Sequence, residues 1–137
     1  MANTNALSQR MSDRPMLAVS KRMVTPADAT YDLIKIPRFG FVTDVWVLVT
    51  TAFTAAGSTL TVGWLGNGQT AVTNGFITTD VSKPTVTGMK RGQSDALTTF
   101  EAKWFYTSGG IITCTTNDNA GTAGTFWVFA NYYVLHP

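Results

Sequence analysis

The stretch Gly124-Thr125-Phe126-Trp127-Val128-Phe129-Ala130-Asn131-Tyr132-Tyr133-Val134-Leu135 predicts a long β-strand that is apolar on both of its sides. Side chains alternate between the two sides of a strand, so that one side carries Phe126, Val128, Ala130, Tyr132 and Val134. The opposite side carries Trp127, Phe129, Asn131, Tyr133 and Leu135. The core of a small domain can bury only one of these sides. The other side therefore needs a second layer or another protein to cover it.

The segment 42–53 has the same doubly apolar character. Val45, Val47 and Val49 lie on one side of this predicted strand, and Trp46 and Leu48 lie on the other. The segment 58–65 differs, because its apolar side chains alternate with threonine and glycine. It predicts a strand with one buried side and one solvated side.

The composition favours an all-β protein of one domain. The chain has 137 residues, of which 23 are threonine, 12 are glycine and only one is glutamate. Apolar runs separated by turn residues predict about eight strands in a two-sheet, jelly-roll-like sandwich. The strands are expected at 16–19, 30–36, 42–53, 58–65, 76–81, 98–107, 111–116 and 125–135, and 82–95 is expected to form an exposed loop or a short irregular edge. Residues 1–14 are polar and predict a flexible arm in front of a single domain at 15–137.

The low charge of the chain suggests that much of its surface is covered in the working state. Charged residues make up 13% and aromatic residues 12%, whereas a free soluble domain usually carries about 25% charged residues. The alternative explanation of the low charge is a surface rich in threonine and serine, which stays soluble without charged residues. The net charge of +2 does not by itself indicate a nucleic-acid partner.

The sequence does not predict a membrane or secreted protein. No apolar run reaches the roughly 18 residues that a membrane span needs, and residues 1–14 lack the apolar stretch of a signal peptide. We therefore expect a protein that is made and used without secretion.

The sequence argues against an enzyme, because it lacks the residues that most catalytic sites require. Its only histidine, His136, is the penultimate residue, where a rigidly held general base is not expected. A single cysteine, Cys114, excludes an internal disulfide, and one cysteine with one histidine does not make a zinc site. The eight carboxylates are dispersed, which favours turns and solvated positions over a catalytic pair. We predict no catalytic residue, no cofactor and no metal.

Two short motifs are compatible with an ordinary turn or with a ligand-binding loop. The run Asn117-Asp118-Asn119 before Gly121 weakly resembles a calcium loop, but Asn, Asp and Gly are also the residues that hairpin turns prefer. Gly63-Trp64-Leu65-Gly66-Asn67-Gly68 lacks the lysine and the following helix of a phosphate-binding loop. We interpret the first as a turn sequence, and in the second we interpret 66–68 as the turn that follows the strand at 58–65.

Four of the ten basic residues lie near the start of the chain, at Arg10, Arg14, Lys21 and Arg22. A polar, positively charged arm can bind an acidic protein surface, touch nucleic acid or remain a solvated tail. Most aromatic residues lie in uncharged runs rather than beside these cations, which argues against single-strand binding. The protein-contacting arm is the interpretation that we carry forward.

The four tryptophans also have two interpretations. Their side chains either line a sugar-binding groove or pack in the core against the strands that contain them; the residues are Trp46, Trp64, Trp104 and Trp127. Large exposed aromatic side chains mark a protein interface as readily as a sugar site.

The order of the strand sequences resembles that of small head-decoration, or cement, proteins of tailed bacteriophages. The resemblance is carried by Tyr31-Asp32-Leu33-Ile34-Lys35-Ile36-Pro37, by the valine-rich run 42–49, by Ser58-Thr59-Leu60-Thr61-Val62-Gly63-Trp64 and by the closing run 126–134. It covers about residues 30–135, and the basic segment 1–22 has no counterpart in it.

This resemblance implies a jelly-roll-like sandwich that binds the outer surface of an assembled capsid and carries no active site. Such a virion protein would be assembled in the host cytoplasm. Its expected partners are the major capsid protein and other copies of itself, in a dimer or trimer. Neither nucleic acid nor a membrane is an expected partner. We expect self-association through Trp127, Phe129, Tyr133, Trp46 and Leu48, and shell contacts from the four basic residues of the arm. A receptor- or carbohydrate-binding module of a phage fibre or tail is the alternative, and a hydrolase is a third candidate.

Overall fold

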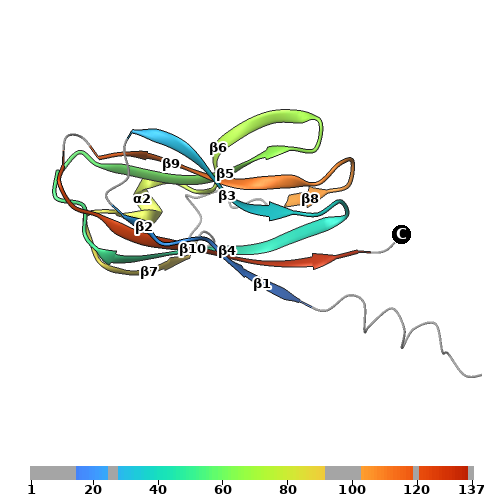
Figure 1. The fold of residues 1–137 in the computed structure, drawn as a ribbon, viewed down its shortest axis with the longest axis horizontal. Helices are drawn as coiled ribbons and strands as arrows, with labels where there is room; N and C mark the ends of the chain where they lie inside the picture. The colour runs from blue at the N-terminus through green and yellow to red at the C-terminus, as the bar shows by residue number, and fades with distance from the viewer. Residues whose placement is uncertain (1–14, 25–27, 92–102, 119–120, 136–137) are drawn as a thin grey trace, which may run out of the picture.

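Two antiparallel β-sheets pack face to face in the computed structural model, which describes residues 15–24, 28–91, 103–118 and 121–135 (Figure 1). One sheet has the order β1-β10-β4-β7, with β2 also beside β10 and β8 also beside β4, and the other has the order β3-β9-β5-β6. The strands are β1 (Met16–Val19), β2 (Met23–Val24), β3 (Ala29–Ile36), β4 (Gly40–Thr51), β5 (Thr59–Gly66), β6 (Gln69–Ile77), β7 (Gly88–Arg91), β8 (Lys103–Phe105), β9 (Gly110–Asn117) and β10 (Thr125–Val134). The predicted all-β, two-sheet sandwich is confirmed.

The ten strands occupy eight positions, because two positions are filled by interrupted strands. β1 and β2 pair with successive parts of β10, and β7 and β8 pair with successive parts of β4. Each sheet therefore has four strand positions. This explains why about eight strands were predicted, and four facing four is the arrangement of a jelly roll.

Several segments differ from the sequence-based prediction. β2 and the first part of β6, at 69–75, were not expected, and of the strand expected at 98–107 the part at 98–102 lies outside the described residues. The strand expected at 76–81 is wrong, because β6 ends at Ile77 and the helix α2 (Thr79–Ser82) follows. The hydroxyl of Ser82 donates to the Leu60 carbonyl at 2.7 Å and thereby holds this turn against β5. The segment 82–95 contains the edge strand β7, so the second of its two expected forms is the correct one. Within the described ranges, no helix has the length and apolar content needed to cross a membrane.

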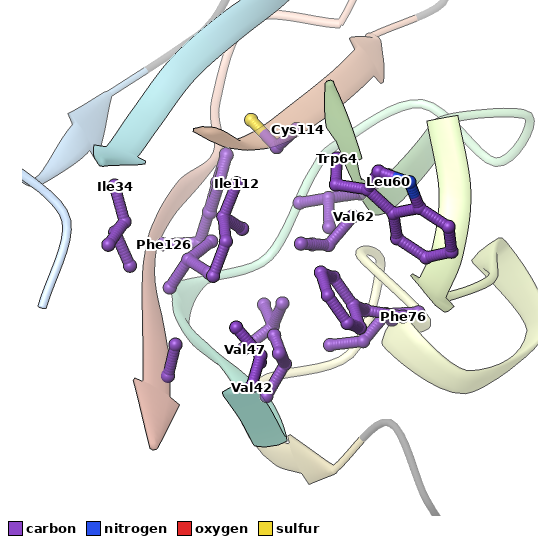
Figure 2. Close-up of a cluster of buried hydrophobic side chains, with 14 of the residues drawn as sticks. Ile34, Val42, Val47, Leu60, Val62, Trp64, Phe76, Ile112, Cys114 and Phe126 are labelled. Carbon is purple, nitrogen blue, oxygen red and sulfur yellow. The ribbon is translucent and has the colours of Figure 1, made fainter. Parts of the chain in front are cut away.

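The core lies between the two sheets and consists of the inward-facing side chains of both (Figure 2). In β10, Phe126, Val128 and Ala130 are fully buried, as the alternation predicted. In β4 the inward side chains are Val45, Val47 and Val49. The facing sheet contributes Ile34, Leu60, Val62, Trp64, Phe76, Ile112 and Cys114, with the rings of Trp64 and Phe76 centred 5.0 Å apart.

Burial removes the chemical reactivity of the one cysteine. Desolvation raises the pKa of the Cys114 thiol to about 12. Its thiolate fraction at pH 8 is therefore on the order of one in ten thousand while the protein is folded.

A buried asparagine joins the β5–β6 hairpin to the chain between β8 and β9. Asn67 adopts a left-handed conformation (φ 57°), and its backbone N–H donates to the Gly109 carbonyl at 2.8 Å. Its Oδ1 accepts a hydrogen bond from the Thr107 N–H at 2.6 Å, and its Nδ2 donates to the Trp104 carbonyl at 3.4 Å. The turn predicted at 66–68 therefore also fixes the end of the opposite sheet.

Replacement of Asn67 separates the side-chain bonds from the backbone conformation. Asn67→Gly keeps the conformation but loses both side-chain bonds, so we expect it to lower the free energy of unfolding by about 1–3 kcal/mol. Asn67→Ala adds left-handed strain of about 1 kcal/mol to the same loss. Urea denaturation measures both values, and an alanine variant as stable as the glycine variant would contradict this role of the left-handed conformation.

Candidate protein-docking face

The outer side of the six-stranded sheet carries a continuous set of apolar and aromatic side chains, which we call the aromatic face. The strand pairing places its residues in rows that run across the sheet. The rows are Val19–Phe129–Trp46–Arg91, Leu17–Asn131–Asp44, Trp127–Leu48–Met89 and Tyr133–Phe41–Trp104.

The structure brings together all five residues that the sequence predicted for self-association. Trp46 and Leu48 of β4 lie directly opposite Phe129 and Trp127 of β10, and Tyr133 follows in the same face. Each of the five is partly exposed, whereas the inward neighbours of the first four, such as Val47 and Val128, are fully buried. The second apolar side of these strands is therefore left open to solvent in the single chain.

A shallow apolar pocket of about 270 Å³ lies in the middle of the aromatic face. Its lining is formed by Leu17 from β1, Met89 from β7, Trp46 from β4, and Phe129 and Asn131 from β10. Leu17 is 63% exposed and Met89 is 56% exposed. The rim of the pocket thus consists of flexible aliphatic side chains and its centre consists of aromatic rings, a combination that is common at protein interfaces.

One ion pair is set into this face. Arg91 Nε donates to Asp44 Oδ2 at 2.8 Å, Arg91 Nη2 makes a second contact with the same oxygen, and the guanidinium lies 5.3 Å from the centre of the Trp46 ring. Asp44 is buried, whereas the side chain of Arg91 is 56% exposed. The hydrogen bond from Arg91 to Asp44, together with the Asp44 charge, raises the pKa of Arg91. Asp44 Oδ1 has no hydrogen-bond partner among the described residues, so it remains an acceptor under the face.

The outer side of the four-stranded sheet has the opposite character, and we call it the threonine face. Thr30, Thr61 and Thr115 lie side by side on three neighbouring strands, and the hydroxyls of Thr30 and Thr115 are 2.8 Å apart. Asp32, Lys35 and Thr59 are exposed on the same side. Gly63 also lies there, where the Val72 carbonyl of β6 approaches so closely that a Cβ would collide with it. Leu65 and Ile111, in the row of Lys35, are partly exposed apolar residues on this side. The threonine face nevertheless lacks the row of aromatic rings that the aromatic face carries.

The basic residues predicted for shell contacts are only partly covered by the structure. Lys21 and Arg22 are exposed between β1 and β2, at the edge of the six-stranded sheet. Arg10 and Arg14 lie outside the described residues. The two described cations stand beside the aromatic face, at the β1 side of the sheet.

The chemical sites weighed in the sequence fall at turns or outside the described ranges. His136 and Asn119 are outside them, and the described residues contain no cluster of three metal-ligating side chains. The Asp118 N–H donates to Asp28 Oδ1 at 2.9 Å, and the Asp118 carbonyl accepts from the Ser58 hydroxyl at 3.0 Å. Asp118 thus acts as a connection between loops.

The tryptophans divide between the two interpretations given to them. Trp64 is a core residue, whereas Trp46, Trp104 and Trp127 belong to the aromatic face. The sequence did not single out Leu17, Phe41 or Met89 for this face. The alternation of Met16–Val19 carried a signal for Leu17, but a four-residue strand does not reveal which side is buried.

Solved structures with the same fold are found among bacteriophage capsids. A chain of the acidic stable capsid structure of Helicobacter pylori bacteriophage KHP30 superposes with a TM-score of 0.60 at 16% identity, over 89% of each chain. A chain of the cyanophage Pam1 capsid asymmetric unit superposes with a TM-score of 0.62 at 15% identity, over 90% of this chain and 86% of that one. No family model and no curated protein matches the sequence. At these identities the likeness establishes the fold, and the predicted jelly-roll-like class is confirmed.

A double-mutant cycle on the ion pair tests whether Arg91 compensates the buried charge of Asp44. We expect Arg91→Met to lower the free energy of unfolding, because it leaves the buried carboxylate of Asp44 unpaired. Adding Asp44→Asn should recover most of that loss, since no charge then remains to be compensated. Thermal or urea unfolding measures the cycle, and strictly additive effects of the two substitutions would contradict the coupling.

Proposed function

We propose that this protein is a structural component of a bacteriophage virion that binds the outer surface of the assembled capsid and cements neighbouring shell subunits. The observation that carries the proposal is the contrast between the aromatic face and the threonine face of the same sandwich. The likeness of the fold to chains of two phage capsids supports the viral setting. The major capsid protein and other copies of this chain are the proposed partners.

The physical argument begins with the exposed apolar surface. Fully burying one large apolar side chain contributes about 1.5–3 kcal/mol, and the aromatic face presents a group of them on adjacent strands. An isolated face of this kind promotes non-specific association, whereas in an assembly it is covered. We place five residues of this face in the interface of the assembled particle, where the face contacts the shell as well as the neighbouring copy: Trp46, Leu48, Trp127, Phe129 and Tyr133.

The threonine face is suited to remain in solvent. Its short hydroxyl side chains hydrogen-bond to water and to one another, as Thr30 and Thr115 do. A decorating protein with one apolar and one polar outer face has a defined orientation on the shell. The low charge of the chain is compatible with solubility once the aromatic face is covered.

Cementing needs no catalytic residue, cofactor or metal, and it gains strength from repetition. Each copy contributes a modest contact with the shell and another with its neighbour, and symmetric repetition multiplies weak contacts through a high effective concentration. The exposed cations Lys21 and Arg22, with Arg10 and Arg14 preceding them in the sequence, are the groups that we assign to acidic parts of the shell.

A matched pair of single-charge substitutions tests the role of the two faces. Met89→Asp places a carboxylate in the exposed rim of the pocket, and Thr59→Asp places one at an exposed position of the threonine face. We expect Met89→Asp to weaken binding to purified capsids about tenfold or more, because its charge would be desolvated at the contact, and Thr59→Asp to leave binding unchanged. Co-sedimentation with capsids measures occupancy.

The thermal midpoint of each variant shows whether it retains the fold, since both positions are exposed. Equal capsid occupancy for the two variants would contradict the assignment of the aromatic face. A stronger effect of Thr59→Asp would reverse the proposed orientation on the shell.

Removal of residues 1–14 tests the basic arm. The deletion takes away Arg10 and Arg14 and leaves the described strands intact, so we expect an unchanged thermal midpoint and weaker attachment to capsids, above all at low salt, where charge contacts are strongest. Substitution of the two arginines by glutamine in the full chain is the matched control. A truncated protein that decorates capsids at unchanged occupancy would exclude the arm from the contact.

The pocket also supports a second candidate, a carbohydrate-binding module of a fibre or tail. Trp46 and Phe129 beside Asn131 give aromatic surface next to an amide, which sugar sites use. Four of the five lining residues are apolar, however, and the one nearby carboxylate is paired with Arg91. This lining favours a protein partner, and glycan binding that is lost in Met89→Asp would favour the second candidate instead.

A further inference from the structure

The first strand of the six-stranded sheet is an apolar edge that no other described strand pairs with on its outer side. Met16, Leu17 and Val19 of β1 are 47%, 63% and 47% exposed, and β1 contains neither a charged residue nor a proline. Natural sheets usually protect their edges with charge, proline or a covering loop, because an open edge pairs with other strands. In the described part of the chain, β1 pairs with β10 alone.

The backbone of β1 leaves a defined set of hydrogen-bonding groups on its open side. The Ser20 N–H donates to the Val128 carbonyl of β10 at 2.8 Å. Since consecutive residues of an antiparallel strand point their backbone groups to opposite sides, Ala18 also bonds toward β10. The N–H and C=O groups of Leu17 and Val19 therefore point away from the sheet. These two residues make β1 a template for one more strand.

We propose that a second copy of this chain occupies this edge, with its own β1 antiparallel to the first about a two-fold axis. The inference deepens the self-association that the proposed function includes and rests on it. The two six-stranded sheets would then form one sheet across two molecules. An isologous contact of this kind uses the same residues twice, so one complementary strand is sufficient.

The register of this pairing follows from two constraints. Directly opposed residues share one side of the sheet, and both Leu17 and Val19 must find a backbone partner. Leu17 opposite Leu17 of the second copy would place Val19 opposite Pro15, which has no N–H to donate. Val19 opposite Val19 would place Leu17 opposite Lys21, which lies beyond the end of β1. Leu17 opposite Val19 of the second copy gives the backbone groups of both residues a hydrogen-bond partner in each copy. Ala18 then faces Ala18 of the second copy at the axis.

Side-chain size and charge agree with this register. Ala18 is the smallest side chain of β1 and lies at the axis, where the two copies approach most closely. No charged residue lies within β1, and the exposed cations Lys21 and Arg22 follow it beyond the paired segment. Leu17 and Val19 point to the aromatic face, so the pairing joins two aromatic faces into one apolar surface on the same side. A partner strand of unrelated sequence would not produce that continuity.

The matched variants Val19→Pro and Val19→Thr test the hydrogen bonds of the edge. Proline removes the Val19 N–H, which points to the open side of β1 in the described part of the chain, and edge strands tolerate proline where that group faces solvent. Threonine keeps both the N–H and the shape. We expect wild type and Val19→Thr to show a monomer–dimer equilibrium by sedimentation between about 10 µM and 1 mM, and Val19→Pro to dimerise at least about tenfold more weakly with an unchanged thermal midpoint.

Cysteine substitutions test the register directly. In the proposed pairing the two Ala18 residues form a non-hydrogen-bonded pair with Cα atoms about 4.5 Å apart, which a disulfide spans. Ala18→Cys should therefore cross-link readily under mild oxidation, whereas Leu17→Cys, which faces Val19, should not. Cys114 does not interfere, because it is buried and its thiol stays protonated.

Three results would overturn the inference. The first is a protein that stays monomeric up to about 1 mM and gives no Ala18→Cys cross-link. The second is a dimer that Val19→Pro leaves intact. The third is protection of the Leu17 and Val19 amides from hydrogen exchange only when capsids are added. The last result would assign the edge to a shell strand. Capsid binding separates this inference from the proposed function. If the contrast between Met89→Asp and Thr59→Asp persists without edge pairing, only the inference fails. A β1 dimer that does not bind capsids rejects only the capsid role.

Discussion

The pairing of β4 with β10 is the constraint on which the rest of the structure depends. These two strands form the centre of the six-stranded sheet, and both are apolar on each side. The facing sheet buries the inward valines of β4, and Phe126 and Val128 of β10, and no third layer of described chain covers the outer side. A sandwich of two layers covers only one of the two apolar sides of these strands. The aromatic face is the other side, which the second layer does not cover.

The alternation of side chains in these strands was sufficient to predict which residues lie on which side. The buried set of β10 and the outward position of Trp127 and Phe129 follow from a period of two, because a long strand in a sheet cannot change sides without a bulge. Two irregularities in the pairing of β4 with β10 do shift the register, near Thr43 and near Thr50. The first of them allows Val42 to be buried together with Val45, which simple alternation does not predict.

Features that depend on contacts distant in sequence were not predictable from local patterns. The segment 82–95 resembles a loop because of its glycine and lysine content, and β7 forms there only because β4 offers an edge to pair with. The ion pair of Asp44 with Arg91 joins residues 47 positions apart, so no local spacing indicated it. The helix α2, which follows the end of β6, is joined to β5 by the bond from Ser82 to the Leu60 carbonyl, which is likewise a tertiary contact.

The aromatic face and the β1 edge contribute different physical terms to the assembly that we propose. Burial of aromatic and aliphatic surface supplies free energy but little directional information, because the hydrophobic effect depends mainly on the area removed from water. Backbone hydrogen bonds at an edge supply less net free energy, but they fix direction, register and the side on which neighbouring side chains lie. Leu17 belongs to both elements, since its backbone lies at the open edge and its side chain lines the pocket of the face. A dimer made through the edge would hold two apolar faces in one orientation, and each face would then bind its shell partner at the effective concentration set by the other. Contacts that are individually weak become a durable attachment in this way.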